Sequence, residues 1–140
     1  MDGDGGCRLA VWDRGIRAQE MIISIRNIQK QYRLDTGRIR KLAICLMNVA
    51  IHRGQPHVWK DAAVVLTDDA GIEAINRLHL SRQGTTDVIS FNYIPMPGDR
   101  NACSGEIIVN VQRAVERGSS RRPPNASMEL ALYIAHGFDH

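Results

Sequence analysis

Short segments rich in Ile and Val alternate with segments of helical periodicity, and this alternation restricts the fold more than any other feature. Four segments predict strands: residues 21–28, 62–66, 87–93 and 106–111. Apolar residues spaced three or four apart predict helices over 36–52, around 72–78 and from 127 onward, with a turn or two after 111. This order predicts an α+β fold, a single domain with a mixed sheet of about four strands packed with helices. A mixed α/β arrangement stays open.

Oxygen-bearing side chains stand where the predicted helices begin. Thr36 and Ser127 are expected to cap the first and last helices. Thr67, Asp68 and Asp69 lie where the cap and first turn of the short helix need oxygen acceptors and negative charge. The helix over 36–52 is dense in apolar residues, which predicts a central helix covered on most sides.

The chain of 140 residues has the length of one domain. Residues 1–20 are rich in Gly and charge, so we expect a loose N-terminal leader, with Met21 as an alternative start and residues 21–140 as the domain. Apolar residues make up 44% and charged residues 24%, which excludes a disordered or collagen-like chain.

The composition also bears on compartment and partners. No run of 18 apolar residues occurs, which predicts no membrane partner. Three well-separated cysteines and no recognisable secretory signal favour a reducing, cytoplasmic location. The net charge of +3 permits a polyanionic partner, although two Trp and two Phe offer few rings for base stacking.

Two histidines close the sequence, His136 and His140, four positions apart in a predicted helix. Side chains with this spacing project together, so two imidazoles can share one divalent ion at about 2.0–2.1 Å each. Zinc, nickel, cobalt and copper all suit such ligands. Gly137 stands where an H-E-x-x-H peptidase has its glutamate base, which argues against peptidase chemistry. The plain alternative is two surface histidines at a helix end.

Two further segments place polar groups among apolar strand residues. The segment TTDVISF (85–91) carries Asp87 and Ser90, and SGEIIVNV (104–111) carries Gly105 and Glu106. A structural role is the simpler interpretation of each, since Asp87 can satisfy backbone donors in a turn and Glu106 can face solvent.

Taken together, these segments resemble the YbeY family of bacterial metal-dependent endoribonucleases that mature ribosomal RNA. The family carries T-D-V-(L/I)-(S/T)-F, then G-(D/E)-I-x-I-S, then H-G-x-x-H-x5-H. The corresponding residues occur in the same order at 86–91, 105–109 and 136–140. The segment 75–77 is also similar, and the resemblance is looser over 21–61.

The resemblance implies a single-strand-specific endoribonuclease that processes the 3′ end of small-subunit ribosomal RNA. It implies one divalent metal, zinc being favoured, bound at the C-terminal helix by His136 and His140. The family's third histidine would follow about six residues after His140, so the resemblance implies that the C-terminal end of the domain is incomplete. We therefore expect weak metal binding or none, and reduced or absent activity.

The family's catalytic arginine corresponds to Leu80 in this sequence, so the catalytic residue is unknown, and Arg82 is a weak substitute candidate. The implied partners are a ribosomal RNA precursor and the small ribosomal subunit or its assembly factors. Five arginines are candidates to contact RNA phosphates: Arg77, Arg82, Arg113, Arg121 and Arg122.

Two other functions stay open. A non-catalytic ribosome-assembly module of the same fold is favoured by Leu80 and by the missing third histidine. A metal-dependent hydrolase of another substrate, such as a peptide or small ester, is the second alternative.

Overall fold

The computed structural model describes residues 7–13, 17–52, 58–93 and 102–139. Within these ranges nine elements follow one another: β1 (Cys7–Asp13), β2 (Arg17–Asn27), α1 (Thr36–His52), β3 (Val58–Thr67), α2 (Asp69–His79), β4 (Val88–Tyr93), β5 (Ala102–Asn110), α3 (Val111–Ser119) and α4 (Ala126–Asp139). The predicted α+β fold is confirmed. Within the described ranges, no helix combines the length and apolar character that a membrane span needs.

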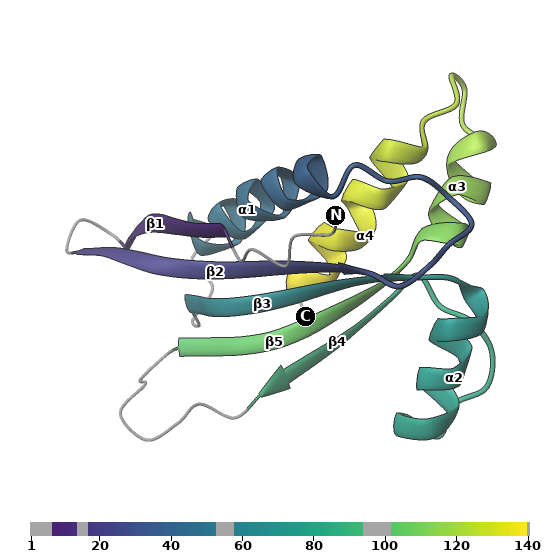
Figure 1. The fold of residues 1–140 in the computed structure, drawn as a ribbon, viewed down its shortest axis with the longest axis horizontal. Coiled ribbons are helices and arrows are strands. Elements are labelled where there is room, and N and C mark those ends of the chain that lie inside the picture. Colours follow the sequence, from purple (N-terminus) through teal and green to yellow (C-terminus); the bar gives the residue numbers. More distant parts are fainter. Residues whose placement is uncertain (1–6, 14–16, 53–57, 94–101, 140) are drawn as a thin grey trace.

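One mixed sheet of five strands forms the centre, in the order β1-β2-β3-β5-β4 (Figure 1). β2, β3 and β5 are parallel, and β1 and β4 pair antiparallel at the two edges. Each predicted strand is present, and β3 and β5 begin about four residues earlier than their β-branched residues indicate.

The N-terminal segment differs from the loose leader expected from composition. Residues 7–13 form β1, which pairs with β2 from Cys7 opposite Ile23 to Asp13 opposite Arg17. The sequence signal is weak because only a few apolar residues alternate there. The edge of β2 nevertheless offers unpaired backbone groups to any extended segment. This pairing adds the fifth strand.

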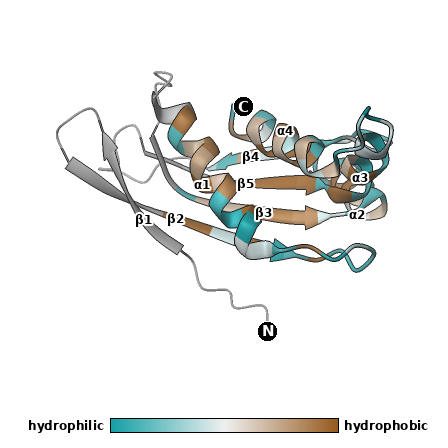
Figure 2. Cartoon of the chain, turned by 90° about the horizontal axis from the view of Figure 1, so that it is seen from above, coloured by the Kyte–Doolittle hydropathy of each residue, from teal (hydrophilic) through white to brown (hydrophobic). Residues whose placement is uncertain are grey.

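The main core lies between the sheet and the helices α1 and α4, which cover the same face (Figure 1). Ile23, Val64 and Ile107 of the strands meet Met47 and Phe138 of the two helices. Figure 2 shows the apolar colouring of β3 and β5 beneath these helices.

The expectation that α1 is covered on most sides is wrong. It packs on the sheet with one face, and Val49 on its outer face is 50% exposed. A helix on a sheet surface needs apolar residues only where it touches the sheet.

On the opposite face, α2 covers the end of the sheet near β4 (Figure 1). Ile72 of α2 packs with Val65, Ile89 and Ile108 in a smaller core.

Two predicted helix caps are displaced by one or two residues. Asp35, rather than Thr36, caps α1, and Asn125, rather than Ser127, caps α4: their side-chain oxygens accept hydrogen bonds from amides three residues on, at 3.1 and 2.9 Å. Asp and Asn cap helices at least as well as Ser and Thr. The cap is therefore the residue whose side-chain oxygen reaches the amide three positions on. Of the three residues expected at the start of α2, Asp68 is the cap.

Asn110, at the end of β5, connects three elements and has no exposed surface. Its amide donates to Asp69 Oδ1 at 2.6 Å and to the Thr86 carbonyl at 3.1 Å. Its side-chain oxygen accepts from the Arg113 amide at 3.1 Å and thereby caps α3. Its backbone amide donates to the Asp87 carbonyl at 2.8 Å. The starts of α2, α3 and β4 are therefore held at one point.

Replacing Asn110 with Ala should lower the free energy of unfolding by about 3 kcal/mol, because a cap is lost and half-buried polar partners lose their hydrogen bonds. Urea denaturation followed by circular dichroism measures the change. As a control, Asn48→Ala on α1 should change stability by less than about 0.5 kcal/mol. Equal losses in the two variants would contradict this role.

Candidate functional site

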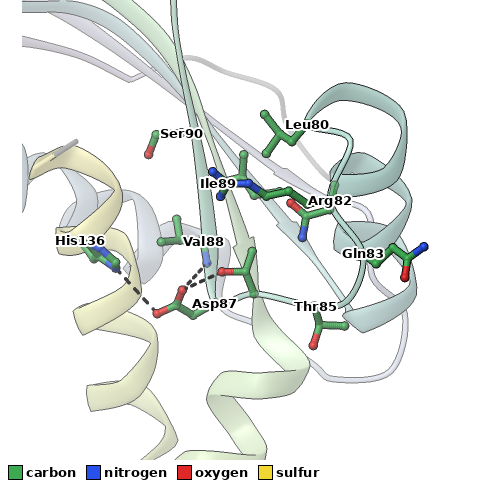
Figure 3. A pocket seen from close by; sticks show the side chains of 11 residues that line it. Leu80, Arg82, Gln83, Thr85, Asp87, Val88, Ile89, Ser90 and His136 are labelled. Atoms are coloured by element: carbon green, nitrogen blue, oxygen red, sulfur yellow. Dashed lines mark hydrogen bonds and ion pairs between the residues drawn. The ribbon is translucent and has the colours of Figure 1, made fainter.

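A pocket of about 510 Å³ opens between α4, β4 and the loop that joins α2 to β4. Figure 3 shows His136 on α4 at one side and Leu80 and Arg82 on the loop at the other, with β4 between them. The lining residues are Asn76, Leu80, Arg82, Gln83, Thr85, Thr86, Asp87, Val88, Ile89, Ser90 and His136. Most of the lining therefore comes from one continuous stretch of chain, which α4 closes.

The α2–β4 loop is organised by Asn76, which is 4% exposed. Its carbonyl accepts hydrogen bonds from the amides of Leu80 and Arg82, at 3.1 and 3.0 Å. Its side-chain amide donates to the Gly84 carbonyl at 3.0 Å. Gly84 has a φ of +93°, a backbone conformation that glycine adopts without strain. The loop backbone is thus held in place, and Arg82 is exposed at the pocket.

His136 and Asp87 form the polar side of the pocket. His136 Nδ1 lies 3.7 Å from Asp87 Oδ2, and their side chains are 49% and 28% exposed (Figure 3). The other oxygen, Asp87 Oδ1, accepts from the Val88 amide at 2.9 Å and from the Thr86 hydroxyl at 3.2 Å. The predicted turn role of Asp87 is present, and the same carboxylate also faces a histidine.

The last turn of α4 lies directly on the sheet because residue 137 is glycine. A Cβ there would lie 2.5 Å from Ile107 Cγ2 and 3.1 Å from Val88 Cγ2. The Gly137 carbonyl accepts a hydrogen bond from Ser90 Oγ at 2.8 Å. These contacts set where the preceding residue, His136, sits above β4.

The donor atoms at the pocket suit one side of a metal site. His136 offers an imidazole, a ligand type that binds zinc, and the Asp87 carboxylate faces the Nδ1 of that imidazole. Within the part of the chain that the structure describes, no three His, Cys, Asp or Glu residues gather as a metal site. His140 lies outside that part, so the His136–His140 pair stays a prediction.

Two of the five candidate arginines lie at the pocket. Arg82 lines it, and Arg113 donates to the Thr85 carbonyl at 3.4 Å beside it. Arg77 on α2 and Arg122 after α3 are exposed, and neither lines the pocket.

The fifth candidate, Arg121, lies at the other end of α4 from His136. Its Nε donates to the carboxylate of the buried Glu129 at 2.6 Å, so this guanidinium is engaged within the fold. Burial raises the pKa of the neighbouring Tyr133 hydroxyl, and the Glu129 charge adds to the shift. Tyr133 is therefore uncharged at neutral pH.

Glu106 lies on the sheet face opposite to His136, because strand residues alternate and its neighbour Ile107 contacts α4. The Tyr93 hydroxyl donates to Glu106 Oε2 at 3.0 Å, and this bond raises the pKa of Tyr93. Glu106 is thus separated from the pocket chemistry.

Replacing Gly137 with Ala should lower the free energy of unfolding by about 1–3 kcal/mol, because the new methyl group must displace Ile107. Thermal or urea unfolding tests this. Gly37→Ala, near the start of α1, is the matched control: a Cβ there would lie 3.3 Å from Oδ1 of the exposed Asp35 side chain, which can move slightly, so the change should be within about 1 kcal/mol of neutral. A neutral result at position 137 would show that α4 has room to shift.

Comparisons with known proteins identify relatives of this chain. The family model described as Endoribonuclease YbeY matches residues 24–140. The chain is 30% identical to an Endoribonuclease YbeY of Syntrophus aciditrophicus over 131 residues, covering 91% of this chain and 77% of the relative. It is 28% identical to that of Geobacter metallireducens, covering 86% of this chain and 77% of the relative. It is 38% identical to the Endoribonuclease YbeY of Rhodopirellula baltica, and this match covers 55% of this chain and 39% of the relative.

The matched region contains all the lining residues of the pocket. On the extent of these matches, this chain belongs to the YbeY endoribonuclease family.

Proposed function

We propose that this protein is a metal-dependent endoribonuclease that cleaves single-stranded RNA. The observation that carries the proposal is the pocket itself, where a half-exposed histidine, a carboxylate and an exposed arginine come together in a chain of this family. Histidine suits a divalent metal, and arginine suits a phosphate.

In this proposal His136 holds the metal, with His140 and a further residue as the remaining ligands. When bound, such an ion lowers the pKa of a coordinated water and offsets negative charge on a phosphoryl oxygen. Arg82 contacts a phosphate of the RNA backbone, and Arg113 extends the positive charge along the same side.

The size of the pocket supports the proposed preference for single strands. A volume of about 510 Å³ between α4 and the α2–β4 loop is large enough to admit an unpaired nucleotide. A base that is stacked and paired within a duplex cannot enter such a pocket without being extruded. The few aromatic residues favour recognition through the RNA backbone.

The proposed substrate is a precursor of small-subunit ribosomal RNA, cleaved near its 3′ end in the cytoplasm. The proposed partners are the small ribosomal subunit or its assembly factors. Zinc is the favoured metal. These statements rest on membership of the family.

A non-catalytic binding module is the second candidate, and one observation favours it. Leu80, which occupies the family's arginine position, lines the pocket and is 36% exposed, so an apolar side chain stands there. Peptide hydrolysis has less support, because the packing around Gly137 leaves no room for a glutamate base at that position.

Replacing His136 with Ala should reduce cleavage of a single-stranded RNA oligonucleotide by at least about 100-fold, because the metal loses a ligand. A fluorescent cleavage assay with added zinc measures this, with the same sequence as a duplex for comparison. His79→Ala on α2, whose ring packs against Phe91 outside the pocket lining, should retain activity. No cleavage by the unaltered protein while zinc is bound, with RNA binding retained, would favour the binding module.

Replacing Arg82 with Ala should weaken RNA binding uniformly across sequences and reduce the slope of log affinity against log salt by about 1, because one phosphate contact is lost. Fluorescence anisotropy at several salt concentrations gives the slope. The control is Arg26→Ala on β2, which β3 and β5 separate from β4. An equal change in the two variants would indicate nonspecific attraction by net charge.

A further inference from the structure

We propose that Asp87 is a positioning residue that fixes the tautomer and ring orientation of His136, so that Nε2 is the nitrogen presented to a metal. The inference rests on the proposed function for the identity of the ligand that His136 binds. The arrangement of the two side chains is given by the structure alone.

The two oxygens of Asp87 have different surroundings. Oδ1 accepts from the Val88 amide and the Thr86 hydroxyl, and these bonds set the rotation of the carboxylate. The same rotation directs Oδ2 toward His136 Nδ1, at 3.7 Å (Figure 3). The carboxylate therefore faces one particular nitrogen of the imidazole.

Both ends of this contact are attached to the core. The Asp87 carbonyl accepts from the backbone amide of Asn110, which is fully buried. On the other side, Gly137 touches Ile107 and its carbonyl binds Ser90, which holds the last turn of α4. The separation between carboxylate and imidazole is thus set by backbone positions rather than by two free side chains.

The chemistry of the pair selects one tautomer. An ionised carboxylate only accepts hydrogen bonds, so it favours the form of neutral imidazole that carries its proton on Nδ1. The lone pair then resides on Nε2, as in carboxylate–histidine–metal arrangements. The distance of 3.7 Å exceeds a hydrogen bond by about 0.8 Å, and such contacts often tighten only when the ligand binds.

Asp87→Asn tests the inference with little change of shape. The amide oxygen can still accept from Val88 and Thr86, but an NH2 group replaces the oxygen that faces His136. Because this group donates, it favours Nδ1 as acceptor and moves the proton to Nε2. We expect the tautomer of metal-free His136 to switch in long-range ¹H–¹⁵N spectra. We also expect the affinity for zinc, measured by competition with a chelating dye, to fall about tenfold.

Asp35→Asn is the control, since it removes the same charge at the α1 cap while asparagine still caps well. It should leave both measurements unchanged. A Nε2-protonated His136 in the unaltered protein, or an unchanged tautomer in Asp87→Asn, would overturn the inference.

The two proposals fail in distinguishable ways. If the unaltered protein binds no zinc, metal dependence fails, and the tautomer measurement still decides the role of Asp87. If Asp87→Asn binds zinc normally with a switched tautomer, the positioning role in metal binding fails while the proposed nuclease is unaffected.

Discussion

The contact between the last turn of α4 and the sheet determines the geometry of the candidate site. It requires glycine at position 137, because Ile107 and Val88 occupy the space that a side chain would need. The hydrogen bond from Ser90 to the Gly137 carbonyl fixes the same turn from β4. His136 precedes this glycine, so close packing of the core decides where the imidazole meets Asp87. The packing of Gly137 in the core and the position of His136 in the site therefore depend on the same contacts.

Two buried asparagines complete the pocket from the other side. Asn76 holds the α2–β4 loop, and Asn110 holds the segment that carries Thr86 and Asp87. Buried amides of this kind are stable only when their hydrogen bonds are made, so they hold a loop in one conformation. The exposed Arg82 is thus displayed on an ordered backbone, which limits the entropy lost when it binds a ligand. Hydrogen bonds of buried asparagines thus hold the α2–β4 loop, whereas apolar packing holds α4.

Strands and helices could be predicted from the sequence, because each element buries one face, and this repeats apolar residues at the spacing typical of a strand or a helix. One example is the stripe of Leu130, Ile134 and Phe138 on α4, which shares one side of the helix as predicted and is buried in the main core. The edge strand β1 could not be predicted, since backbone pairing with β2 requires little of its side chains. The cap positions at Asp35 and Asn125 depend on local geometry among neighbouring candidates.

The sequence by itself determined the α+β class and the family, and it predicted His136 as a metal ligand, because these follow from periodicity and from residues in a fixed order. Only the tertiary structure decided that His136 and Asp87 face each other, since 49 positions of chain separate them and the sheet brings β4 and α4 together. It also distinguished Arg82 at the pocket from Arg121 at a buried carboxylate. A sequence specifies which charged side chains a protein has, whereas folding decides which groups lie close enough to interact with them.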